Sequence, residues 1–167
     1  KILIFTIMNS VKLSEVTISN HDWLIETLVR YFDNDIVSFS PQIDRLSREW
    51  DEISKSRFIE SLILGLPIPQ LVLASSSTER NKFIVIDGKQ RLLALSQFYS
   101  GDLSLTGLEF WRELEGNTYD SLKSNPYLSD AIFNLDASVL RVSLIRNWQD
   151  ESLLSDIRSR LKPSHDE

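Results

Sequence analysis

The stretch from Phe83 to Gly101, FIVIDGKQRLLALSQFYSG, constrains the fold more than any other part of the sequence. The apolar run 83–86 predicts a buried strand, and the pair Asp87-Gly88 ends it. Apolar residues then recur at spacings of three and four, which predicts a helix over 89–99. A strand that turns directly into a helix leaves the N–H groups of the first helical turn without partners. Such a turn attracts anions, and phosphate above all.

The side chains of this turn add to its attraction for phosphate. Lys89 and Arg91 contribute cations, Gln90 contributes an amide, and Gly88 lets a ligand approach the backbone closely. The same residues also fit an ordinary strand–turn–helix whose basic side chains are solvated. The local pattern alone leaves both interpretations open.

Length and composition limit the class of protein. The 167 residues, 42% hydrophobic and 25% charged, suffice for one globular domain with its own core. The net charge of −6 argues against a general affinity for nucleic acid, and the lack of cysteine excludes disulfides and thiolate chemistry. The apolar segment KILIFTIM has eight residues, whereas a membrane span needs about 20. We therefore expect a cytoplasmic protein that has no membrane partner.

The whole chain, 1–167, predicts a single α+β domain with a small mixed sheet and packed helices. Strands are expected at 36–39, 71–74, 82–86 and 139–145, with the second and third as an antiparallel pair; 11–19 is also compatible with a short strand. Helices are expected from Ser19 or Asn20 to Phe32, and over 51–64, 89–99, 126–133 and 150–161. An extended piece is expected at 103–108. The core should span about 36–146, with helical additions at 1–35 and 147–167.

Several segments, in a fixed order, carry a resemblance to a known family. SREWDEISKSRFIESLILGLPIPQLVLA, with an arginine and a tryptophan ahead of its helix, is followed by a polar loop and then by FIVIDGKQRLLALSQFYSG. In this order the chain resembles the N-terminal domain family of GmrSD-type modification-dependent restriction enzymes. That family carries a DGQQR signature and is similar to the ParB/sulfiredoxin-like nucleotidase superfamily. The resemblance covers roughly 36–146 and is weaker through LEFWRELEGNTYDSL and VLRVSLIRN.

The resemblance implies a domain that binds a nucleoside triphosphate with Mg²⁺ and in some members hydrolyses it. Such a domain usually gates a DNA-cleaving domain or chain in defence against phage. The resemblance places Asp87, Gly88, Lys89, Gln90 and Arg91 at the phosphates. Asp87 would hold magnesium or orient a water, and Arg91 would neutralise phosphate charge as a planar fork. These two residues would be the catalytic pair of an NTPase.

Three further residues are candidates for the same nucleotide site. Arg45 matches, loosely, the family's arginine ahead of the tryptophan. Arg57 and Glu60 stand one helical turn apart and would face the same cleft. A surface ion pair on a solvated helix face is the alternative for these two residues.

Two departures from the family leave two functions open. Lys89 replaces the first glutamine of the signature, which would alter hydrolysis or nucleotide preference. With His21 and His165 as the only histidines, and His21 expected at a helix start, no nuclease site built on several histidines is recognised. The first function is a nucleotide-binding regulatory domain of a DNA-restriction or phage-defence system. The alternative is a non-catalytic ParB-like module that binds DNA or a partner protein.

Overall fold

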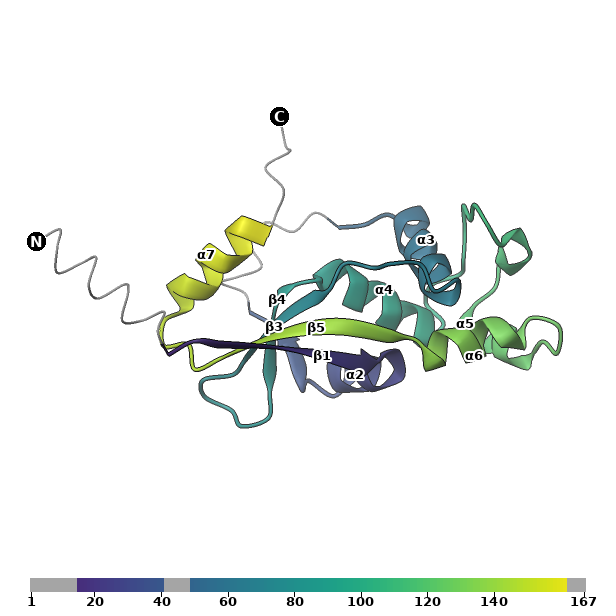
Figure 1. The fold of residues 1–167 in the computed structure, drawn as a ribbon. Helices are drawn as coiled ribbons and strands as arrows, with labels where there is room; N and C mark the ends of the chain where they lie inside the picture. The colour runs from purple at the N-terminus through teal and green to yellow at the C-terminus, as the bar shows by residue number, and fades with distance from the viewer. Residues whose placement is uncertain (1–14, 41–48, 162–167) are drawn as a thin grey trace, which may run out of the picture.

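The computed structural model describes residues 15–40 and 49–161, and its five strands form one mixed sheet in the order β1-β5-β3-β4-β2 (Figure 1). β1 (Thr17–Leu24) is antiparallel to β5 (Val139–Arg146), and β5 is parallel to β3 (Leu71–Ser75). β3 is antiparallel to β4 (Phe83–Asp87), and β4 is parallel to β2 (Val37–Phe39). The predicted α+β class with a small mixed sheet is confirmed.

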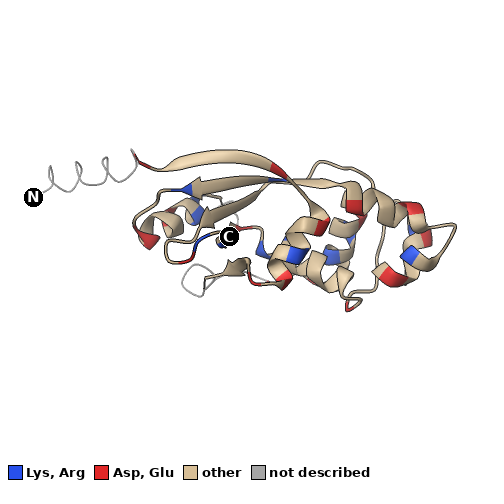
Figure 2. Cartoon of the chain, turned by 90° about the horizontal axis from the view of Figure 1, so that it is seen from below, with Lys and Arg blue, Asp and Glu red and all other residues tan. Residues whose placement is uncertain are grey.

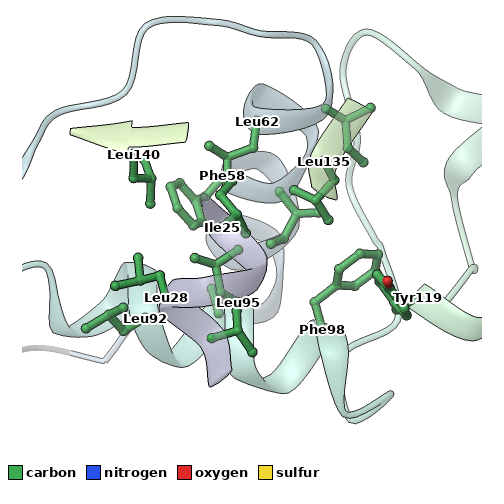
Figure 3. Close-up of a cluster of buried hydrophobic side chains, with 14 of the residues drawn as sticks. Ile25, Leu28, Phe58, Leu62, Leu92, Leu95, Phe98, Tyr119, Leu135 and Leu140 are labelled. Atoms are coloured by element: carbon green, nitrogen blue, oxygen red, sulfur yellow. The ribbon is translucent and has the colours of Figure 1, made fainter. Parts of the chain in front are cut away.

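Helices cover both faces of this sheet. The main core joins one face to side chains from α2 (Ile25–Asp33), α3 (Glu52–Ile63), α4 (Lys89–Tyr99), α5 (Tyr119–Ser124) and α6 (Ser129–Ala137). Figure 3 shows part of it, where leucines of α2, α3 and α4 converge with Phe58 and Phe98. The second cluster joins the other face to α7 (Glu151–Leu161), which lies at the opposite end of the molecule from α5 and α6 in Figure 1.

The central strand β3 shows why the apolar runs of the sequence become buried strands. Successive side chains of a strand point to opposite faces. Leu71 and Leu73 therefore enter the main core, while Val72 and Ala74 enter the second cluster. A strand that is covered on both faces needs consecutive apolar residues rather than alternation.

The predicted helix from Ser19 or Asn20 is wrong at its start, because residues 17–24 form β1. This strand pairs with β5 along its whole length, from Thr17 opposite Arg146 to Leu24 opposite Val139. Asn20 accepts a hydrogen bond from Ser143 (2.7 Å) and does not cap a helix. His21 also lies in the strand, where its Nε2 is 2.8 Å from the Ser19 hydroxyl. Pairing with β5 outweighs local capping preference, so the expected helical addition over 1–35 contains a strand.

The region between α4 and β5 also differs from the prediction. The helix expected at 126–133 begins at Ser129 and ends at Ala137. α5 was not predicted, and it starts with a capping box between Thr118 and Ser121. The piece expected to be extended at 103–108 has no strand. The short strand expected at 11–19 overlaps β1 only from Thr17 onward, and its residues 11–14 lie outside the described part of the chain. The remaining predicted elements are confirmed to within a residue or two. None of the helices in the described ranges is long and apolar enough to cross a membrane.

Candidate functional site

A hollow of about 150 Å³ lies where β4 runs into α4. Its lining comes from the segment before α3, from the β4–α4 turn and from α7: Trp50, Ile86, Asp87, Gly88, Lys89, Gln90, Arg91 and Arg158. The structure thus brings together the five predicted residues 87–91 around one space.

Gly88 sets the geometry of the turn. Its φ is +108°, a conformation that L side chains rarely adopt, and a Cβ built there would lie 2.1 Å from Cδ2 of Leu71. Gly88 is also the N-cap of α4, so no side chain caps this helix. The first-turn N–H groups and the positive end of the helix dipole therefore face the hollow without a capping side chain.

Arg91 fastens the turn to the neighbouring segment. Its Nη1 donates to the carbonyl oxygens of Pro69 and Gln70, the latter at 3.1 Å, and its Nη2 binds Oδ2 of Asp87 at 2.6 Å. Burial lowers the pKa of this guanidinium, and the Asp87 carboxylate opposes that shift. With only 8% of the residue exposed, Arg91 borders the hollow while its guanidinium binds protein oxygens. We call this set of contacts the Arg91 clasp.

Gln90 carries an unused hydrogen-bond donor. Its Oε1 accepts the backbone N–H of Trp50 (3.0 Å), and the residue is 9% exposed. Its Nε2 is buried and has no hydrogen-bond partner in the described chain. A buried polar group without a partner costs about 1–3 kcal/mol. A polar ligand atom in the hollow would remove that cost.

Positive charge predominates around the hollow, in a chain whose net charge is −6. Among the described residues that line it, Lys89, Arg91 and Arg158 carry positive charge and Asp87 alone carries negative charge. The Nζ atom of Lys89 lies 5.1 Å from the ring centroid of Phe39. Over the rest of the fold, acidic and basic positions are interspersed along the helices (Figure 2).

The structure places Arg57 and Glu60 against a different segment, residues 107–111. Glu60 is 2% exposed and accepts three backbone N–H groups, from Glu109, Phe110 and Trp111, at 2.7–3.1 Å. Arg57 donates to the carbonyl of Gly107 (2.9 Å) and pairs with Glu109 (2.8 Å). These contacts hold a loop, and neither residue lines the hollow. Arg45 lies outside the described residues.

Two lining residues were not among the predicted site residues. Trp50 appeared only as part of the family pattern, and here its ring packs edge-on against Phe58 (5.7 Å between centroids) at the border of the main core. Arg158 stands in α7, far along the sequence from the turn. No spacing signal links it to residues 87–91, because only the packing of α7 on the sheet brings it there.

The fold and the site together define an α+β domain with an anion-attracting strand–turn–helix, and the sequence comparisons identify its family. The model described as GmrSD restriction endonuclease, N-terminal domain, matches residues 25–165. This chain therefore belongs to that family, and the predicted resemblance is confirmed. A search of curated proteins returns no match.

The chain is similar to a solved structure. That structure is the C-terminally truncated chromosome-partitioning protein ParB from Caulobacter crescentus, complexed with CTP-gamma-S. The identity is 9% and the TM-score is 0.44, over 87% of this chain and 54% of that chain. The nucleotide analogue named there is the ligand of that protein.

Gly88→Ala tests the close approach of the turn to β3. We expect it to lower the free energy of unfolding by about 2–4 kcal/mol, because the left-handed backbone and the collision with Leu71 both add cost. Gly101→Ala is the matched control, since its φ is also positive (+84°) but nothing lies within 4 Å of the added Cβ. It should cost about 1 kcal/mol. Equal losses for both variants in denaturant unfolding would contradict this account of the turn.

Arg91→Ala tests whether the clasp is structural. Removing the guanidinium leaves the Asp87 carboxylate and two carbonyl oxygens without their donors, so unfolding without ligand should become easier by about 2–4 kcal/mol. Arg57→Ala removes a guanidinium whose side chain is 50% exposed and should cost less than about 1 kcal/mol. An Arg91→Ala protein as stable as the wild type would show that the clasp contributes nothing to the fold.

Proposed function

We propose that this domain binds a nucleoside triphosphate with Mg²⁺, with the phosphates at the N-terminus of α4. The observation that carries the proposal is the buried Nε2 of Gln90, which has no partner among the described residues and lies beside an uncapped helix N-terminus. A helix start favours an anion, and the surrounding side chains carry a surplus of positive charge. A phosphate oxygen would accept the hydrogen bond that Gln90 has to offer.

The size of the hollow indicates which part of the ligand it holds. At about 150 Å³ it is smaller than the roughly 300–1,000 Å³ typical of pockets that enclose whole drug-sized ligands. It suits phosphate groups, with the sugar and base lying outside it. Base preference would then depend on residues beyond the hollow.

The donor set fits a magnesium ion that arrives with the nucleotide. Mg²⁺ at phosphate sites is usually held by one or two carboxylates together with phosphate oxygens and water. Among the described residues, Asp87 is the one carboxylate that lines the hollow, and because the clasp engages its Oδ2, Oδ1 would face the cation. Asp87 would hold the ion, which would neutralise phosphate charge when bound.

The geometry supports binding more strongly than hydrolysis. Asp87 is ion-paired to Arg91, and Arg91 is itself committed to the clasp, so both side chains already have protein partners. We therefore assign Asp87 and Arg91 to binding and to positioning of the turn. We assign the direct phosphate contacts to the backbone N–H groups of the first turn of α4 and to the side chains of Lys89 and Gln90.

Family membership sets the context of the proposed nucleotide site. We propose that the domain regulates DNA restriction in phage defence and that cleavage of DNA belongs to another domain or chain. The described residues contain no group of three or more His, Asp or Glu side chains that could hold a catalytic metal. The alternative of a module that binds a partner protein without nucleotide leaves the Gln90 donor unexplained, and the net charge of −6 argues against its DNA-binding form.

Thermal unfolding with Mg²⁺ and each of ATP, CTP, GTP and UTP tests the proposal. A ligand that binds only the folded state at 100 times its Kd stabilises it by about 2.7 kcal/mol, so at least one triphosphate should raise Tm. Lys89→Ala should weaken binding about tenfold in calorimetry, whereas Lys55→Ala on α3, which removes the same charge away from the hollow, should not. No rise in Tm with any triphosphate, or equal effects of the two variants, would refute it.

A further inference from the structure

One side of the hollow is lined by Arg158, which lies outside the signature residues 87–91. Arg158 comes from α7, on the face of the sheet opposite to α2, α3 and α6. We propose that Arg158 binds a phosphate group of the ligand, and that ligand binding thereby holds α7 against the sheet. This inference rests on the proposed function and adds to it a binding residue and a coupled element.

The packing of α7 explains how Arg158 reaches the hollow. Leu154 is fully buried in the second cluster, and Arg158 follows it by four residues, on the same side of the helix. Ile86 belongs to the second cluster and also lines the hollow. The surface that anchors α7 is therefore continuous with the wall that Arg158 contributes.

The anchoring of α7 is light compared with that of α4. Leu154 is the one buried residue in the described part of α7, with Leu153 and Ile157 partly buried, whereas six residues of α4 are buried. Elements that bury few apolar contacts open more readily than the core of a domain. One additional charge-assisted contact would therefore change the docking of α7 more than that of α4.

The chemistry of arginine suits this role. A guanidinium presents a planar fork of donors that matches phosphate oxygens, and such charged hydrogen bonds are stronger than neutral ones. A triphosphate between the α4 N-terminus and Arg158 would bind elements on both faces of the sheet. By linkage, ligand binding must stabilise docked α7, and docked α7 must strengthen ligand binding by the same factor.

The test compares Arg158→Ala with Arg160→Ala in the full chain. Arg160 lies on the same helix, is exposed and does not line the hollow, so both variants remove one charge from α7. The probes are inorganic tripolyphosphate and the four nucleoside triphosphates, each with Mg²⁺. We expect Arg158→Ala to weaken binding about tenfold or more, and Arg160→Ala to change it less than about twofold.

Hydrogen exchange of the amides of 151–161 supplies the second measurement. Ligand should slow this exchange in the wild type and in Arg160→Ala, and should slow it much less in Arg158→Ala. Arg158→Lys, which keeps the charge without the fork, should bind with intermediate affinity and provides a variant if the alanine protein folds poorly.

The outcomes separate this inference from the proposed function. If Arg158→Ala binds as Arg160→Ala does, or if ligand leaves α7 exchange unchanged in the wild type, the inference is overturned. The Lys89→Ala defect would still support the proposed site in that case. If no probe binds the wild-type chain, the inference and the proposed function fail together.

Discussion

The Arg91 clasp is the interaction on which the candidate site depends. The guanidinium joins Asp87 at the end of β4 to the backbone just before β3, and so fixes the turn from which α4 begins. Gly88 lets the turn lie against Leu71, where a Cβ would collide. The Arg91 guanidinium is buried while Asp87 is partly exposed, so breaking the clasp would cost more than breaking an ion pair between two exposed side chains. The helix N-terminus is thus held open toward the hollow before any ligand arrives.

The two buried polar side chains Glu60, in α3, and Gln90, in α4, differ in whether the protein itself satisfies their hydrogen bonds. Glu60 is nearly inaccessible to solvent, and its carboxylate accepts hydrogen bonds from three backbone N–H groups of a loop. Its burial is therefore explained by its structural role in holding that loop. Gln90 is buried to a similar extent, but one of its two polar atoms has no partner in the described chain. Buried polar groups are nearly always satisfied, and this exception at an uncapped helix start is the observation that supports the proposed ligand.

The sequence predicted those elements whose pattern is local. Consecutive apolar residues in β3 and β4 and the three-and-four spacing of α4 are properties of short segments, and residues 87–91 occur together in one of them. The errors arise where contacts between segments far apart in the sequence determine the structure. Ser19 and Asn20 favour a helix cap locally, but they lie in β1 because this strand pairs with β5. Arg57 and Glu60 share a helix face, as predicted, yet that face meets residues 107–111. Arg158 could not be found from sequence, because its place depends on how α7 packs.

The most direct test of the account is the side-chain amide signal of Gln90 in an NMR titration with triphosphate and Mg²⁺. If phosphate accepts the unused hydrogen bond, the Nε2 protons should shift strongly and saturate at the ligand concentration that saturates the backbone N–H signals of 88–91. Side-chain amides of Gln97 and Gln149, which do not line the hollow, should stay unchanged. Binding that saturates while the Gln90 signal remains in place would contradict the central claim, because the ligand would then lie elsewhere on the domain.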